Sequence, residues 1–294
     1  LALAVLAEEA GVPAGVFNIV TTTQSQDVGK ELTENPLVRK FSFTGSTAVG
    51  KQLIRQCAST VKKVSMELGG NAPFIVFDDA DIDAAVKGAI ISKYRNAGQT
   101  CVCANRLYVQ DGVYDEFVEK FIIATRALVV GRGDKDGVSI GPMISEAAVE
   151  KVERLLDDAR AKGGEVVEGG ARHAMGGQFY EPTIVRDATA EMDFATEEIF
   201  GPIAPVFRFK EDQEVIDLAN ATEYGLAAYF YARDLGRVWR VAEGLDYGMV
   251  CINDGILSTE TAPFGGMKES GMGREGSKYG IDEYIELKYI TLAG

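Results

Sequence analysis

Cys101 and Glu67 are two side chains that could carry covalent chemistry together. A thiolate is a strong nucleophile, and the turn-forming run Gly98-Gln99-Thr100 would leave Cys101 accessible to a substrate and to backbone N–H groups. Glu67 precedes Leu68-Gly69-Gly70, and a carboxylate near a thioester can activate the water that cleaves it. A cysteine taken alone is more often a small buried apolar residue, so the pair needs support from the surrounding sequence.

Glycine-rich segments indicate how a cofactor could be held. Residues 45–51 fit the first seven positions of a P-loop, but Gln52 stands where Ser or Thr should hold magnesium. We therefore favour a turn that points a helix N-terminus at a cofactor's phosphates, with Ser46 also able to cap that helix. Residues 271–276 satisfy G-x-G-x-x-G without following a strand, so we do not interpret them as a nucleotide motif. Gly69-Gly70 suits a sharp turn or a hinge between domains.

Composition excludes several classes of protein. The chain has 294 residues, 46% of them hydrophobic and 25% charged, with a net charge of −14 that argues against a nucleic-acid partner. No apolar run approaches the ~18 residues of a membrane helix. The four cysteines show no disulfide or zinc spacing, so we expect a reducing, cytoplasmic setting and no metal. His173, the single histidine, lies in a polar glycine-rich loop and receives no catalytic role.

The first 69 residues alternate between helical and strand patterns. This rhythm predicts parallel strands and the C-terminal half of a doubly wound dinucleotide-binding domain over residues 1–69. The expected helices are 1–10, 24–34 and 46–57, and the expected strands are 16–20, 38–43 and 62–66.

From residue 70 the pattern begins again and predicts a second α/β domain over 70–282. A tail at 283–294 alternates apolar and polar residues over 284–292, as in a strand that invites pairing with another chain. The expected helices are 82–94, 113–129, 147–162, 215–220 and 235–243, and the expected strands are 74–77, 107–109, 203–207, 227–231 and 249–252.

Five segments, in this order, resemble the aldehyde dehydrogenase superfamily: FTGSTAVG at 43–50, MELGG at 66–70, GQTC at 98–101, EEIFGP at 197–202 and PFGGMKESG at 263–271. The sequence is most similar to succinate-semialdehyde dehydrogenases, through KYRN at 93–96 and GREGSKYG at 273–280. The resemblance implies an α/β fold: part of a doubly wound dinucleotide-binding domain, an α/β catalytic domain and a C-terminal oligomerisation strand. It also implies a homo-oligomer, a dimer or tetramer, and a place in γ-aminobutyrate catabolism.

The resemblance assigns roles to individual residues. Cys101 would attack the aldehyde with its backbone N–H as an oxyanion donor, and Glu67 would activate water, so that the product is a free acid rather than a coenzyme A thioester. NAD or NADP would be held by residues of the first, second and fourth segments, with Glu198 on the nicotinamide ribose and Phe200 against the ring. The cofactor set is Gly45, Ser46, Gly50, Leu68, Glu198 and Phe200.

Substrate choice depends on Arg95, six residues before Cys101. A guanidinium at a pocket wall offers two hydrogen bonds to a carboxylate, although an arginine in a surface salt bridge is the plain alternative. In the resembled subfamily a matching Arg and Ser258 hold the substrate's acid end, and Phe264 would line the aldehyde site. We therefore expect succinate semialdehyde as substrate, with another acid-bearing semialdehyde such as glutarate semialdehyde as the alternative.

Aldehyde dehydrogenases carry a long stretch before the point that matches Leu1, so we expect this chain to be the C-terminal portion of a longer protein. That stretch would hold the second oxyanion donor, an Asn, and the residues that choose NAD or NADP. A non-catalytic fragment is therefore the alternative from a different class. Cys101 and Cys103 could also form a strained, reversible disulfide that silences the enzyme.

Overall fold

The computed structural model describes all 294 residues, which form two compact units. The smaller unit consists of residues 1–41 and 51–63, and the larger of 42–50 and 64–294. Every residue of the predicted site belongs to the larger unit. No helix in the structure combines the length and the apolar character needed to cross a membrane.

The smaller unit is helical, as predicted, with α1 (Ala2–Glu9), α2 (Ser25–Glu34) and the C-terminal part of α3 (Thr47–Cys57). Its one fully buried polar side chain is Thr33, whose hydroxyl bonds the Gly29 and Lys30 carbonyls and Gln56. The strand predicted at 16–20 is wrong, because these residues are exposed and extend beside no other strand. Apolar, β-prone residues do not make a strand without a neighbour to bond their backbone groups.

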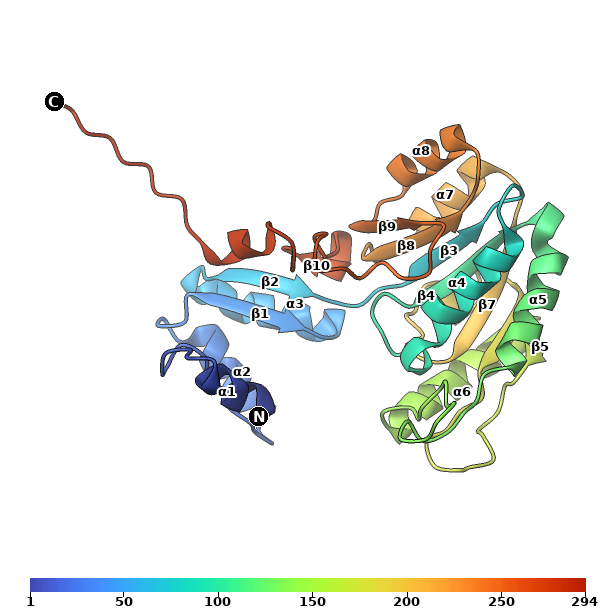
Figure 1. Ribbon diagram of the computed structural model, residues 1–294, viewed down its shortest axis with the longest axis horizontal. Helices are drawn as coiled ribbons and strands as arrows, with labels where there is room; N and C mark the ends of the chain where they lie inside the picture. Colours follow the sequence, from blue (N-terminus) through green and yellow to red (C-terminus); the bar gives the residue numbers. More distant parts are fainter. The chain divides into compact units, whose positions relative to one another are not determined.

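A seven-stranded sheet, ordered β5-β6-β7-β4-β3-β8-β9, forms the frame of the larger unit (Figure 1). All neighbouring pairs are parallel except β5 with β6. Both faces of the central strands are buried, and β3 has the continuous apolar run that this requires. The strands are β3 (Ala72–Val76), β4 (Ala104–Gln110), β5 (Glu165–Glu168), β6 (Thr183–Ala188), β7 (Ile203–Phe209), β8 (Ala227–Tyr231) and β9 (Met249–Ile252).

Five helices connect these strands, close to where the sequence predicts them. Side chains of Asp81, Ser145 and Asp234 each accept a hydrogen bond from a backbone N–H of the first turn, which explains where three of the helices begin. The helices are α4 (Ile82–Tyr94), α5 (Tyr114–Arg126), α6 (Glu146–Ala161), α7 (Asp212–Asn220) and α8 (Leu235–Gly244).

A second, three-stranded sheet is ordered β1-β2-β10, from β1 (Lys40–Thr44), β2 (Lys63–Glu67) and β10 (Gly271–Met272). β10 runs antiparallel to β2, with Gly271 opposite Glu67. It is only two residues long, and the sequence pattern missed it. Its pairing brings a segment from the end of the chain against the end of β2.

The C-terminal tail, 285–294, has no secondary structure and exposes its apolar side chains. The strand predicted at 284–292 is therefore not formed within this chain, because no strand of the chain pairs with it. Its pairing with a second copy stays a prediction, as does the division into domains at residues 69 and 282.

Candidate active site

Glu67 is the last residue of β2, and its carboxylate is buried, with 5% of the residue exposed. One carboxylate oxygen, Oε2, has no hydrogen-bond partner. Burial and the neighbouring Glu275 carboxylate raise the pKa of Glu67 to about 8, against an opposing effect of Arg274. A carboxyl with this pKa exchanges a proton near neutral pH, which is the property a general base needs.

Cys101 lies three residues before the start of β4, after a sharply coiled turn over Arg95–Gly98. Asn96 and Ala97 adopt left-handed φ values of 53° and 56°, and Gly98 follows at 75°. A side chain at Gly98 would collide with the carbonyl oxygen of Gly201, so glycine is required there both for its φ and for the close approach. The turn fixes where the β4 strand begins and thus where Cys101 lies.

The surroundings of Cys101 favour the neutral thiol. Burial raises its pKa to about 11, and the Glu198 and Glu67 carboxylates add to the rise. Hydrogen bonds from the backbone N–H groups of Cys101 and Val102 oppose it. The predicted backbone donors are therefore present, but a base must take the thiol proton before the sulfur can attack at neutral pH.

Gly69 and Gly70 bring these groups together. The Gly70 N–H donates to Glu198 Oε1 at 2.9 Å, and a Cβ on Gly70 would collide with the Cys101 carbonyl. A Cβ on Gly69 would lie 3.0 Å from Glu198 Oε2. The two glycines thus permit close contact between the end of β2, Cys101 and Glu198, which supplies a reason for them beyond a sharp turn.

The site lies at the amino ends of the parallel strands in the large sheet. Gly70 precedes β3, Cys101 precedes β4 and Gly201 precedes β7, so all three lie at the amino ends of parallel strands. Ligands in open α/β sheets more often bind beyond the carboxyl ends. β2, which belongs to the other sheet, contributes its carboxyl end, Glu67, to the same place.

The predicted cofactor turn is joined to Glu67 through the backbone. Gly45 and Ser46 are exposed, and the Gly45 N–H donates to the Glu67 carbonyl at 3.0 Å. Ser46 Oγ accepts the Val49 N–H at 3.5 Å, as expected at the start of α3. A side chain at Gly50 would collide with Leu68, so helix and strand pack closely here. An exposed helix N-terminus beside a carboxylate, Glu198, suits the phosphates and ribose of a dinucleotide.

Glu198 itself is held from two sides. Burial raises its pKa, while the Gly70 N–H, Lys151 and Lys93 oppose that rise. Lys151 Nζ donates to the Glu198 carbonyl. Phe200 is 38% exposed and has a left-handed φ of 50°, so its ring projects from the chain rather than entering the core.

The residues predicted to bind the substrate's acid end are exposed. The Arg95 guanidinium makes no hydrogen bond or ion pair in the structure, which excludes the surface salt bridge considered above. Ser258 lies in an exposed loop, and the structure shows no hydrogen bond between it and Arg95. Phe264 is half-buried against the core, and its backbone pairs with Glu275.

Sequence reasoning missed a buried lysine that interacts with Cys103 and, electrostatically, with Glu198. Lys93 is fully buried, donates from Nζ to Asn105 Oδ1 at 3.1 Å, and has its pKa lowered by burial. Cys103 is buried too and donates from Sγ to the Lys93 carbonyl at 3.1 Å. Neither cysteine of the 101–103 pair is bonded to another, and their oxidation stays a prediction.

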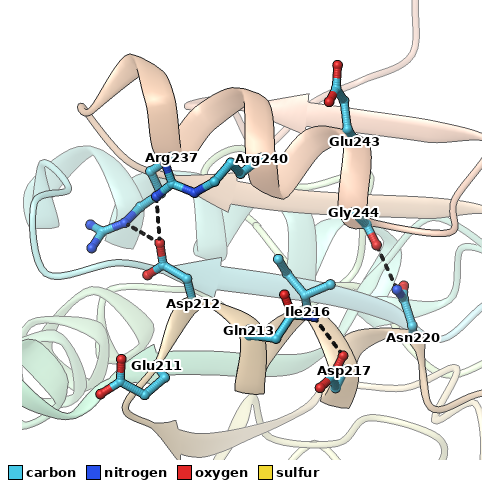
Figure 2. Close-up of a pocket in the computed structure, with 10 residues that line it drawn as sticks. All are labelled: Glu211, Asp212, Gln213, Ile216, Asp217, Asn220, Arg237, Arg240, Glu243 and Gly244. Atoms are coloured by element: carbon cyan, nitrogen blue, oxygen red, sulfur yellow. Dashed lines mark hydrogen bonds and ion pairs between the residues drawn. The ribbon is translucent and has the colours of Figure 1, made fainter.

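Two cavities lie outside this arrangement. Figure 2 shows a polar cavity of about 850 Å³ between α7 and α8, where Arg237 bonds Asp212, and no predicted site residue lines it. A smaller one, about 380 Å³, is lined by Arg274 and Glu275, the residues that act on the Glu67 pKa. The cavity between α7 and α8 therefore lies apart from the predicted site residues, whereas the smaller one adjoins groups that act on Glu67.

The fold is α/β, and the buried Glu67 carboxylate, the Cys101 thiol and the exposed turn at Gly45-Ser46 belong to its larger unit. Residues 1–290 match the model of the aldehyde dehydrogenase family, and the chain belongs to that family. Among solved structures, succinate-semialdehyde dehydrogenase from Burkholderia pseudomallei superposes with a TM-score of 0.97 at 60% identity, over 98% of this chain and 60% of that one.

Curated relatives of similar identity carry different names. The succinate-semialdehyde dehydrogenase [NADP(+)] of Escherichia coli is 64% identical over 292 residues, 99% of this chain and 60% of its own length. A 3-sulfolactaldehyde dehydrogenase of Pseudomonas putida is 63% identical over 100% of this chain and 60% of its own. A glutarate-semialdehyde dehydrogenase of Pseudomonas aeruginosa is also 63% identical, over 100% and 61%. The chain thus spans about 60% of the length of these relatives.

Proposed function

We propose that this chain supplies the catalytic centre for oxidation of an aldehyde to a carboxylic acid with NAD or NADP. The observation that carries the proposal is the proximity of three groups: the Glu198 carboxylate accepts the Gly70 N–H, the Cys101 carbonyl packs against Gly70, and the Glu198 and Glu67 carboxylates both raise the pKa of the Cys101 thiol. A nucleophile, a base and a cofactor ligand from three chain segments match the three tasks of the reaction. The family to which the chain belongs supports the same reaction.

The chain's residues would act in two stages. First, Cys101 loses its proton to a base and its sulfur bonds the aldehyde carbon, giving a thiohemiacetal whose oxyanion the Cys101 backbone N–H can hold. Loss of hydride leaves a thioester on Cys101. Then ionised Glu67 removes a proton from water, the resulting hydroxide attacks the thioester carbon, and the carbon–sulfur bond breaks to release the acid. Because Glu67 must be ionised, its pKa of about 8 sets the pH range of the second stage.

The cofactor would be held by the residues at the start of α3 and by Glu198. When bound, an oxidised nicotinamide accepts the hydride and brings a positive charge near the thiol. Ser46 and the first turn of α3 would bind phosphate, and the Glu198 carboxylate would accept hydrogen bonds from ribose hydroxyls. Relatives with either preference exist, since the E. coli protein is named for NADP(+) and a structure from Sinorhizobium meliloti for NAD.

We infer that the substrate carries an acid group at the end opposite the aldehyde. Succinate semialdehyde, glutarate semialdehyde and 3-sulfolactaldehyde, the substrates for which three relatives are named, all end in a carboxylate or a sulfonate. Arg95, exposed and without an ionic partner, is suited to bind either anion. Succinate semialdehyde is our first choice, and the other two compounds are the alternatives at similar identity.

We further infer that the exposed apolar tail, 285–294, pairs with a second copy of the chain and that the protein acts in the cytoplasm. An unpaired apolar strand sequence is stabilised by addition to another sheet. Analytical ultracentrifugation of the full-length protein and of a form ending at residue 284 tests the pairing. Assembly that survives truncation would contradict it.

The function is tested by steady-state kinetics on the full-length gene product with NAD and with NADP. Three acid-bearing aldehydes and butyraldehyde, which has no acid group, should be compared by kcat/KM. We expect a preference of about a hundredfold or more for an acid-bearing aldehyde, near 2.7 kcal/mol, from a charge-assisted contact. Equal rates would contradict the acid-end assignment, and no turnover with any of them would favour a non-catalytic role.

A further inference from the structure

Ser270 is a fully buried residue at the end of the short turn Lys268–Ser270, with its hydroxyl bonded on both sides. Its Oγ donates to the Gly69 carbonyl at 2.7 Å and accepts the Gly225 N–H at 2.9 Å. Its own carbonyl accepts the Leu68 N–H at 2.9 Å. One residue therefore bonds two successive members of the segment that follows Glu67.

The other side of this connection is anchored in the large sheet. Gly225 leads into β8, and its carbonyl accepts hydrogen bonds from the Gly248 N–H at 2.9 Å and the Met267 N–H at 3.0 Å. The turn is also tightly packed, because a Cβ on Gly266 would lie 2.7 Å from Ser270 Cβ. Ser270 thus ties the end of β2 to a rigid part of the fold.

Loss of the Ser270 hydrogen bonds would displace Glu67 more than Cys101. Gly69 is two residues after Glu67, and the register of β2 with β10 at Gly271 depends on the same turn. Cys101 has separate support, because the Tyr229 hydroxyl donates to the Val102 carbonyl at 2.8 Å. A shift of Gly69 would therefore change the distance of the base from the thioester while the sulfur stays in place.

We propose that Ser270 is a positioning residue for thioester hydrolysis, holding Glu67 at the distance from Cys101 at which it can activate water. The proposal rests on the proposed function. Ser270 does not touch the reacting atoms, because both hydrogen bonds of its buried hydroxyl are with backbone groups. Its effect is to fix geometry, to which reaction rates respond steeply.

The test compares Ser270→Ala with Thr183→Val in the full-length protein. Thr183 is a matched control: it is also fully buried, and its hydroxyl also accepts a glycine N–H, from Gly170 at 2.9 Å, and donates to a carbonyl, that of Glu181 at 2.8 Å. Both substitutions leave an N–H and a carbonyl without their hydroxyl partner, buried at Ser270 and partly buried at Thr183. The stability of both variants is therefore measured by denaturant titration alongside the kinetics.

We expect S270A to lower kcat at least about tenfold more than T183V, with KM changed less than about threefold. The first turnover should still give one reduced cofactor per active site, followed by a slower steady state. Hydroxylamine, added after stoichiometric aldehyde has been converted to the thioester so that no oxime forms, should speed acyl release from S270A and leave that from T183V unchanged. Burst amplitude counts the active sites, so partial misfolding does not enter the rates.

Equal kcat losses in the two variants, or no faster acyl release with hydroxylamine, would overturn the proposal while leaving the function in place. If S270A yields no folded protein, Ser270→Cys, with a similarly sized and weaker donor, should show the same split at smaller amplitude, and a wild-type rate there would overturn it equally. Wild-type protein that forms no reduced cofactor would instead contradict the proposed function and the positioning role together.

Discussion

Glu67 and Cys101 are held by backbone contacts on several sides, whereas Arg95 and Ser258 are exposed and make no hydrogen bond to each other. The part of the site around Glu67 and Cys101 is built with glycines, at positions where any side chain would collide with its neighbours. The part proposed to bind the substrate's acid group consists of the Arg95 guanidinium and the Ser258 hydroxyl. On the proposed function, the groups that run the reaction are thus packed into the fold, while those proposed to choose the aldehyde are exposed side chains.

The reaction should fail completely when its nucleophile is removed. Cys101→Ala should lower kcat/KM by about 10⁴-fold or more, because no other group forms the covalent bond. Cys103→Ala is the control, since this buried thiol interacts with backbone carbonyls and the Lys93 side chain and is not the expected nucleophile. Stopped-flow measurement of cofactor reduction distinguishes the two. A C101A protein with more than about 1% of wild-type activity would remove the covalent mechanism.

Glu67→Gln should affect the second stage selectively. We expect kcat to fall by about 10²–10⁴-fold, the usual contribution of a general base, while one reduced cofactor per site is still formed rapidly. Quenched-flow analysis of acid release checks it. If the first turnover slows as much as the steady state, Glu67 would act before hydride transfer rather than after it.

The pH dependence of kcat and of stability gives a further test of Glu67 as the base. Since burial raises the Glu67 pKa to about 8, wild-type kcat should rise with pH up to about 8 and level off above it, and E67Q should lack this rise. Glu67 in the folded state binds its proton more tightly than in the unfolded chain. The free energy of unfolding should therefore fall as pH rises from the ordinary pKa of a glutamate through about 8. At about 1.4 kcal/mol per pKa unit, E67Q should be more stable than wild type by a few kcal/mol at pH 9 in denaturant titrations.

At the acid end we expect smaller, substrate-dependent effects. Arg95→Leu should lower kcat/KM for succinate semialdehyde by about a hundredfold and leave butyraldehyde within about threefold, because only the former offers a carboxylate. Arg95→Lys, which keeps the charge and loses the planar fork, should fall between the two. An equal loss for both aldehydes would show that Arg95 supports the turn before Cys101 instead.

Ser258→Ala should have the smallest effect, about five- to tenfold in kcat/KM for the acid-bearing aldehyde, as expected for one neutral hydrogen bond. Ser277→Ala, in a neighbouring exposed loop, is the control. Progress curves measured with succinate semialdehyde and with butyraldehyde check the assignment. A change in kcat for butyraldehyde would place Ser258 outside the acid-binding contact.

Much of this architecture could be read from the sequence because local signals carried it. Helices such as α4 and strands such as β8 and β9 begin and end where their apolar patterns and caps predict. β5 and β10 were missed because short or edge strands are defined by their neighbours rather than by their own residues. β6, an interior strand of six residues, was missed as well. The strand predicted at 16–20 does not form, because its β-prone residues have no neighbouring strand with which to pair.

The candidate site followed the same rule. Motif residues predicted that Cys101, Glu67 and Glu198 would act together, and the contacts through Gly69-Gly70 are consistent with that prediction. Ser270 and Lys93 were missed because their importance comes from burial and from partners far away in the sequence. The raised pKa of Cys101 was equally hidden, since it depends first on the burial of the thiol and then on the nearby Glu198 and Glu67 carboxylates.

The most direct test of the account is to trap the thioester. Full-length E67Q would be mixed with succinate semialdehyde and oxidised cofactor, quenched in acid within the first turnover, digested and analysed by mass spectrometry. The account predicts a peptide containing Cys101 that carries the mass of one succinyl group, lost on treatment with hydroxylamine. Rapid cofactor reduction with an unmodified Cys101 would contradict it.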